Sequence, residues 1–213
     1  MDRDTADREC TRAFALAVGM GVQKDPAAAA EIFRRVAHAG YPNGQFGLAE
    51  LLMGGRGTEK DEAEAFELYA IAAEQGHPES SFRLGILLAE KDPGRAEAYL
   101  RKSASVGMVE AMSAMGDLNF EKDPSEAFVW YRSAAEAGAA SAAFMCGYMY
   151  EEGIGIDRDR KAALVLFEQA AKAGLPEAEL KMAHLVDEGA APGGREACFR
   201  WYSLAAGHGM AAA

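Results

Sequence analysis

The sixteen residues Asp123–Gly138, DPSEAFVWYRSAAEAG, carry the signals of a complete helix. Asp123 is a favoured N-cap residue, because its carboxylate accepts a hydrogen bond from an unpaired backbone amide and faces the positive end of the helix dipole. Pro124 suits the first helical position, where no backbone N–H is needed. Gly138 readily adopts the left-handed conformation at which many helices end. The stretch therefore predicts a helix that begins after Asp123 and ends before Gly138.

Five more segments follow the same pattern without a gap. They are DPAAAAEIFRRVAHAG ending at Gly40, DEAEAFELYAIAAEQG at Gly76, DPGRAEAYLRKSASVG at Gly107, DRKAALVLFEQAAKAG at Gly174 and GREACFRWYSLAAGHG at Gly209. The six closing glycines are 36, 31, 31, 36 and 35 residues apart. The N-cap residues are Asp25, Asp61, Asp92, Asp123 and Asp159. Large apolar residues and paired alanines recur at helical spacing, so each segment predicts an amphipathic helix, which we call helix B.

A second helix, helix A, is expected after each closing glycine. Pro42, Pro78 and Pro176 each lie two residues beyond one, again at a helix start. We count positions in helix A as offsets from the preceding closing glycine, and from residue 4 in the incomplete first copy. A glycine inside a helix costs stability, so the small residues at offset nine predict close packing there. They are Ala49, Gly85, Gly116, Gly147 and Ala183.

The long and short copies differ between their two helices. The 36-residue copies carry the turns Gly55-Arg56-Gly57 and Gly153-Ile154-Gly155, and the first copy has Gly19-Met20-Gly21. The 31-residue copies lack this turn. Their missing residues shorten either the turn between the helices or a helix end.

Repetition of this kind predicts an all-α solenoid of about six helix pairs. Each pair buries one stripe internally and needs a neighbouring pair to bury another, so the core extends along the chain. We expect one domain over residues 1–213. Its repeats are approximately 4–40, 41–76, 77–107, 108–138, 139–174 and 175–209, and residues 210–213 begin an incomplete repeat.

Composition and charge restrict the partners and the compartment. The net charge is −11, which disfavours nucleic acid and anionic lipid and favours a basic partner. No apolar run approaches the roughly 18 to 20 residues of a membrane span, so no membrane insertion is expected. The N-terminus MDRDTADREC is unlike a secretion signal. The odd, distant cysteines Cys10, Cys146 and Cys198 do not suit a disulfide framework, so a reducing cytoplasm fits best.

The repeat resembles a known family, the Sel-one-like repeat, a relative of the tetratricopeptide repeat. The best copy is Ala142 to Gly174. Its matching residues are Cys146-Gly147, Tyr150, Gly153, Gly155, Ile156, Asp159, Ala163, Leu166, Phe167, Ala170, Ala171 and Gly174. The resemblance implies a right-handed α/α superhelix that acts as a non-catalytic adaptor or scaffold, and we expect a role in bacterial signalling or regulation. Some secreted cysteine-rich relatives join the two helices of a repeat by a disulfide and are linked to penicillin binding; no repeat here has two cysteines, so that activity is not transferred.

Candidate partner-binding residues lie on one side of helix A, which in such solenoids usually lines the concave face. Offsets three, seven, ten and fourteen fall together there on a helical wheel. The candidates, from offsets seven and ten, are Phe14, Glu50, Arg83, Ile86, Asp117, Met145, Tyr148, Lys181 and His184. The acidic residues at offsets three and fourteen are Glu79, Glu110 and Glu177, and Glu90, Glu121, Glu152 and Glu188. A groove with an apolar floor between acidic rims would bind a peptide or protein with basic and apolar side chains.

Simpler interpretations remain beside this one. Acidic residues near helix ends are often only solvated, and those near an N-terminus also suit the helix dipole. The apolar floor residues Phe14, Ile86, Met145 and Tyr148 can equally be ordinary packing between adjacent helices A.

Signals for catalysis are sparse, and we expect no enzyme, cofactor or metal site. The four histidines are scattered; His38, His77 and His208 lie within two residues of closing glycines, where an imidazole can meet terminal carbonyls. Two alternatives stay open: a hydrolase or amide-binding activity of the kind suggested for the cysteine-rich relatives, and a regulatory subunit docked on an enzyme. Self-association through uncapped ends is a further expectation.

Overall fold

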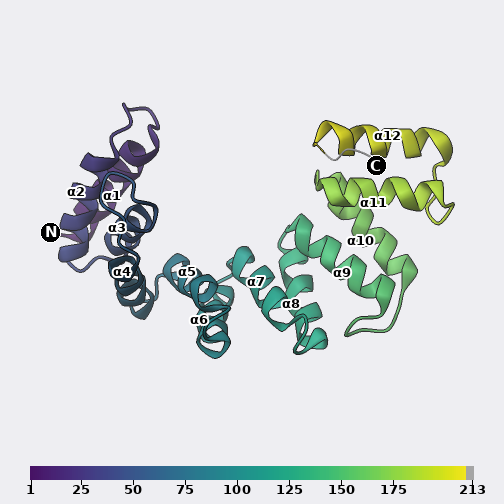
Figure 1. Cartoon of the computed structure of the whole chain (residues 1–213), viewed down its shortest axis with the longest axis horizontal. Helices are drawn as coiled ribbons and strands as arrows, with labels where there is room; N and C mark the ends of the chain where they lie inside the picture. The colour runs from purple at the N-terminus through teal and green to yellow at the C-terminus, as the bar shows by residue number, and fades with distance from the viewer. Residues whose placement is uncertain (210–213) are drawn as a thin grey trace. The chain divides into compact units, whose positions relative to one another are not determined.

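The computed structural model describes residues 1–209, and this part of the chain forms twelve α-helices and no strand (Figure 1). The helices A are α1 (Arg3–Val18), α3 (Pro42–Gly54), α5 (Pro78–Leu88), α7 (Val109–Asn119), α9 (Ala140–Glu152) and α11 (Pro176–Asp187). The helices B are α2 (Pro26–His38), α4 (Glu62–Glu74), α6 (Pro93–Ser105), α8 (Pro124–Glu136), α10 (Arg160–Lys172) and α12 (Gly194–Gly207). The prediction of an all-α helix-pair solenoid is confirmed. The incomplete repeat expected at 210–213 lies outside the described residues.

The first copy, expected to be incomplete, forms a full helix pair. Its helix α1 is sixteen residues long, and Asp2 caps it by accepting a 2.8 Å hydrogen bond from the amide of Thr5. The offsets counted from residue 4 placed Phe14 on this helix, although Arg8 and Arg12 stand at offsets four and eight, where the other repeats carry small or apolar residues. That face of α1 is exposed in the structure.

Helix B begins and ends as its residue types predict. Each of the five aspartates accepts a hydrogen bond of 2.9–3.1 Å from the amide three residues later. All six closing glycines have a positive φ, between 84° and 99°. At Gly138 the glycine amide donates to the carbonyl of Ala135 at 3.0 Å, and the amide of Ala139 donates to that of Ala134 at 2.9 Å. The paired alanines thus supply the two carbonyls of a Schellman motif.

The turn between the helices explains the two repeat lengths. Helices α5 and α7 of the short copies have 11 residues, whereas α3 and α9 have 13, so both the turn and the helix end are shortened. In the long copies the second glycine of the turn contacts the preceding helix B. A Cβ on Gly155 would lie 2.3 Å from the carbonyl carbon of Pro124, and Gly57 meets Pro26 in the same way. The longer turn therefore helps to join one repeat to the one before it.

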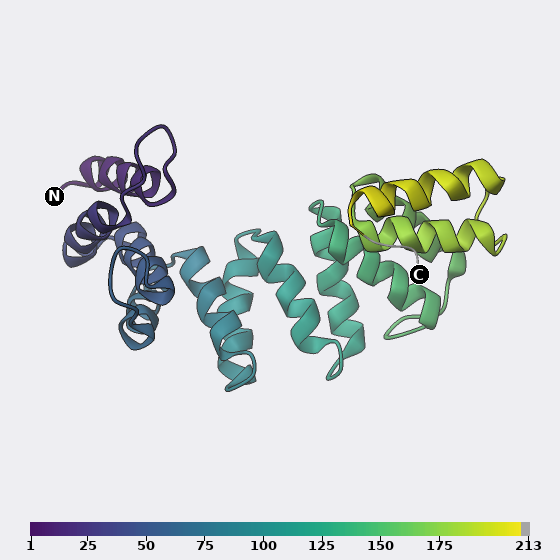
Figure 2. The same ribbon diagram turned by 45° about the horizontal axis from the view of Figure 1, so that its top comes forward.

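Backbone contacts divide the chain into two compact units, which we describe separately. Unit 1 is Met1–Met108 and holds α1 to α6; unit 2 begins at Val109 and holds α7 to α12. In unit 1, helix A and helix B alternate in contact from α1 to α6, and the core contains Phe33, Leu48, Leu51 and Tyr69. The turned view shows the antiparallel pair α11 and α12 of unit 2 side by side (Figure 2).

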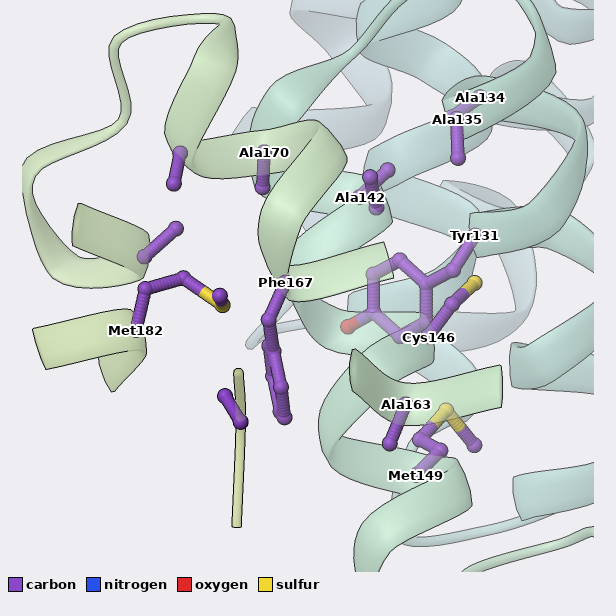
Figure 3. Close-up of a cluster of buried hydrophobic side chains, with 14 of the residues drawn as sticks. Tyr131, Ala134, Ala135, Ala142, Cys146, Met149, Ala163, Phe167, Ala170 and Met182 are labelled. Carbon is purple, nitrogen blue, oxygen red and sulfur yellow. The ribbon is translucent and has the colours of Figure 1, made fainter. Parts of the chain in front are cut away.

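The core of unit 2 contains side chains from α8, α9, α10 and α11 (Figure 3), together with Trp201 of α12. Tyr131, Met149 and Phe167 are each at most 2% exposed. A Cβ on Gly147 would lie 2.8 Å from the ring of Phe167, and Gly116 meets Tyr131 even more closely. The small residue at offset nine therefore makes room for the large central residue of helix B in the same repeat, which gives the close approach of the two helices.

No helix in the described part of the chain is both long enough and apolar enough to cross a membrane.

Candidate functional site

In unit 1 three of the four predicted contact residues already have partners within the chain. Phe14 is 40% exposed, and its ring packs edge to face with that of Phe33 at 5.0 Å. Glu50 accepts a 2.6 Å hydrogen bond from the phenol of Tyr69. It also pairs with Arg83, whose Nε lies 2.7 Å from Oε1 and whose Nη2 lies 3.0 Å from Oε2. This bidentate pair links α3 of the second repeat to α5 of the third.

Ile86, the remaining candidate of unit 1, is 48% exposed and lies on α5. It lines a cavity of about 270 Å³ together with Glu50, Met53 and Arg83. An exposed aliphatic side chain beside this ion pair is available for contact with another molecule.

Unit 2 shows the same division between exposed and engaged side chains. Tyr148 is 39% exposed and Met145 is half-buried. Asp117 accepts a 2.6 Å hydrogen bond from the phenol of Tyr131. Lys181 and His184 also have partners within the chain.

The ammonium of Lys181 lies 2.7 Å from the carboxylate of Glu151 and 5.3 Å from the ring centre of Phe167. The ring of His184 lies 5.7 Å from that of Tyr202. The residue at offset ten therefore often contacts the central residue of its own helix B. Some residues at offset ten, which the sequence assigned to a binding surface, therefore also stabilise their own repeat.

The acidic rims are less regular than the wheel predicts. Glu79 lies in the first turn of α5 and Glu152 ends α9, as expected. Glu90 and Glu121 instead lie beyond the ends of α5 and α7, in the inter-helix turns. Since the short copies have helices two residues shorter, offset fourteen is no longer helical there.

A cavity of about 400 Å³ opens on the helix A side of unit 1, at three successive repeats. Phe14 and Phe46 give it aromatic surface, and Asp7 and Glu79 give it two carboxylates. Arg3 brings one positive charge. The other lining residues are Cys10, Thr11, Asn43 and His77. Of this set the sequence had pointed only to Phe14, and to Glu79 as a rim residue.

A chain of hydrogen bonds joins the three repeats beside this cavity. The side-chain amide of Asn43 donates to the carboxylate of Asp7 at 3.0 Å, and its oxygen lies 3.1 Å from Nε2 of His77. The backbone amide of Ser80 donates to Nδ1 of His77 at 3.2 Å. Because Nδ1 accepts, Nε2 carries the proton and donates to Asn43.

His77 is therefore the N-cap of α5. The sequence had instead suggested that its imidazole meets the terminal carbonyls of α4, and this expectation was wrong. Burial lowers the pKa of His77, and the nearby carboxylate of Glu79 partly opposes this. His208 also differs from the expectation, since its Nδ1 lies 2.9 Å from the carboxylate of the buried residue Glu179. The positions of His77 and His208 near closing glycines suggested that they contact carbonyl groups. The sequence alone could not show which side chains of the paired helix lie opposite them.

Two of the three cysteines, Cys10 and Cys146, are buried. Burial raises the pKa of Cys10 to about 11 and that of Cys146 to about 12, so both are thiols near neutral pH. All three cysteines are free. Within residues 1–209, no group of three His, Cys, Asp or Glu side chains is placed to hold a metal ion.

Comparison with a family model matches the Sel1 repeat six times, over residues 13–41, 42–77, 78–108, 109–138, 140–175 and 176–210. The chain belongs to the Sel1 repeat family. Proteins of this family are generally protein–protein interaction modules, and their repeat scaffolds are generally non-catalytic. No curated protein sequence matches the chain.

Solved Sel1 structures share the fold. One is c5321, described as a protective antigen present in uropathogenic Escherichia coli strains displaying an SLR fold. It matches with a TM-score of 0.86 and 26% sequence identity, and the match covers 96% of this chain. The match covers 46% of that protein, so the present chain spans less than half of its length. Another is a Sel1 repeat protein from Oxalobacter formigenes: TM-score 0.82, 25% identity, 96% of this chain and 88% of that one. The immunity protein Pa5087 from Pseudomonas aeruginosa, at 22% identity, 97% and 83% coverage and TM-score 0.58, shows the fold alone.

Proposed function

We propose that this Sel1 repeat protein is a non-catalytic adaptor in bacterial signalling or regulation, working in a reducing cytoplasm. It binds a peptide or protein segment with basic and apolar side chains along its helix A face. The family supports the general role, since its members commonly bind other proteins. The choice of ligand rests on the residues of this chain.

The cavity of unit 1 carries the proposal. Phe14 and Phe46 offer aromatic surface to an apolar side chain or to the stem of a lysine or arginine. Asp7 and Glu79 offer carboxylates to its charged end. Arg3 opposes a cation at the same place, so its removal strengthens binding. The net charge of −11 favours a basic ligand at longer range.

The helix A face of unit 2 is proposed as a second contact surface. Tyr148 and Met145 supply its apolar part, and Glu152 supplies acidic charge at the end of α9. A series that replaces Glu90, Glu121 and Glu152 by lysine tests the rims. If it leaves the binding of the chosen peptide unchanged, these residues are only solvated surface.

The test uses the full chain and fluorescently labelled peptides that combine Lys or Arg with Leu or Phe. Phe14→Ala and Glu79→Lys each weaken binding, while Arg3→Ala strengthens it. Glu67→Lys is the matched control, because Glu67 is an exposed residue of helix B and its substitution changes the charge equally. Equal weakening by Glu79→Lys and Glu67→Lys would show that only long-range charge matters and would reject the cavity as the site.

One observation favours self-association as a second candidate. Phe199 of α12 is 75% exposed, whereas Phe128, at the same position of α8, is 4% exposed and packs in the core of unit 2. A second copy that covers α12 would bury this ring. Light scattering of the full chain at rising concentration should then show a dimer that Phe199→Ser abolishes, and a monomer at all concentrations would contradict it.

A further inference from the structure

Among the second to sixth repeats, the fifth is unusual at offset eight of helix A. In the other four this position carries a buried Leu or Met. In the fifth repeat it is Cys146, which is also buried, at 1% exposure, but has a much smaller side chain. The larger residues are Leu48, Leu84, Met115 and Met182, each at most 4% exposed.

A cavity of about 270 Å³ lies beside Cys146. It is lined by Cys146 and Tyr150 of α9, by Phe128 of α8 and by Leu166 of α10. The rings of Phe128 and Tyr150 pack edge to face at 5.0 Å, which fixes two of the walls. Figure 3 shows Cys146 on α9, close to Tyr131 and Met149. We call this space the Cys146 cavity.

The mouth of the Cys146 cavity is polar but carries no net charge. Arg132 and Glu136 of α8 stand on one side as an exposed ion pair, with 3.8 Å between Nε and Oε1. Gln169 of α10 stands on the other side. One helical turn before it, on the same face, Val165 is 63% exposed and extends the apolar surface outward. Neither a cation nor an anion is favoured in such a site.

Size and internal comparison indicate what fits. Pockets for drug-sized molecules generally exceed about 300 Å³, so this smaller cavity suits a single side chain. Four other repeats carry a buried Leu or Met at the position of Cys146. An unfilled apolar cavity also forfeits packing energy, which an inserted side chain would recover.

We propose that the Cys146 cavity anchors one Leu, Met or Phe side chain of a protein partner on the helix B side of unit 2. Phe128, Tyr150 and Leu166 surround the inserted side chain, and Val165 contacts the residue next to it. Anchors of this kind supply much of the energy of many interfaces. The site is separate from the helix A face and does not depend on the function proposed for that face.

The decisive variant is Cys146→Leu, which fills the cavity with the residue used at Leu48 and Leu84. We expect it to raise the melting temperature of the full chain, because it adds apolar contacts without crowding. A lowered melting temperature would show that the space does not exist and would overturn the proposal. Cys146→Ala is the matched control, since it removes the thiol and keeps the cavity open.

The binding test selects displayed random peptides against the full chain and removes those that also bind Cys146→Leu. We expect the remaining peptides to share a Leu, Met or Phe. Replacing it with Ala, or using Cys146→Leu as the target, should weaken binding at least about tenfold. Cys146→Ala should bind within about twofold of the natural chain. If no peptide discriminates against Cys146→Leu, or if the shared residue is charged, the proposal is wrong.

Discussion

The phenol of Tyr69 on α4 donates a 2.6 Å hydrogen bond to the carboxylate of Glu50 on α3. Two repeats later, Tyr131 on α8 makes a bond of the same length to Asp117 on α7. In both cases an acidic residue at offset ten meets the central tyrosine of helix B. In these two repeats, an acidic residue on helix A thus stands opposite a tyrosine on helix B. The exposed residue at offset ten is thereby hydrogen-bonded to a residue of the core.

The hydrogen bond between Tyr131 and Asp117 should have a measurable effect on stability. Tyr131→Phe should lower the free energy of unfolding by about 1–2 kcal/mol, because a hydrogen bond to a charged acceptor is lost and Asp117 is partly exposed. Urea unfolding measures the change. A double-mutant cycle with Asp117→Ala isolates the pair, and simple additivity of the two effects would contradict it.

The reverse substitution provides a control in the next repeat. Phe167 is 1% exposed, and the residue at offset ten opposite it is Tyr148, which brings no carboxylate. Phe167→Tyr should therefore introduce a hydroxyl that has no carboxylate at offset ten. Glu151, which lines the cavity beside Phe167, is already paired with Lys181, so the variant should also destabilise the chain.

Local residue types predicted most of the fold. Asp123, Pro124 and Gly138 each need only a few neighbouring residues to act, so their signals can be read along the chain. Offset nine was also predictable, because a glycine in a helix at Gly147 makes sense only with a large residue close by. These effects depend on short-range geometry that every repeat shares.

The cavity of unit 1 was harder to predict for a physical reason. It depends on how far α1, α3 and α5 are displaced from one another, and no single repeat encodes that. Asn43 and His77 are 34 residues apart, and nothing in the sequence pattern indicates that their side chains meet. Counting offsets identified the face of the helix, but it could not give the depth of the surface or the internal partners of its residues.

Two glycines with positive φ should respond differently to the same change. Gly138 has a φ of 99° and open space where a Cβ would stand, so Gly138→Ala should cost about 1 kcal/mol for the left-handed conformation alone. Gly155 has a φ of 69°, and its Cβ would lie 2.3 Å from the carbonyl carbon of Pro124. Gly155→Ala should therefore cost clearly more. Equal losses in urea unfolding would mean that the turn does not pack on α8.

A second pair of glycines separates helix propensity from packing. Gly147→Ala should destabilise the chain by about 1–2 kcal/mol, because overpacking against Phe167 exceeds the gain in helix propensity. Gly94 is helical and exposed, and a Cβ there meets only the carboxylate of Asp92 at 3.7 Å. Gly94→Ala should be neutral or stabilising by about 0.5 kcal/mol. Thermal unfolding of the two variants tests whether their changes in stability have opposite signs.

His77 should make the stability of the chain depend on pH. Burial lowers its pKa in the folded state, and Glu79 only partly opposes this, so at mildly acidic pH the unfolded chain binds the proton more readily. The contribution is fully present above the ordinary histidine pKa of about 6.5. It is lost as the pH falls from there through the folded-state value, because the unfolded state then holds more protons.

His77→Asn tests this effect while keeping a good N-cap residue on α5. The natural chain should lose stability relative to the variant between pH 7.5 and pH 5.5, since only histidine has a proton to take up there. Urea unfolding at several pH values gives the two curves. Parallel curves would show that folding does not lower the pKa of this imidazole and would contradict the prediction. If the free energies of unfolding of the two chains converge at high pH and diverge below pH 6.5, protonation of His77 weakens the contact between the second and third repeats.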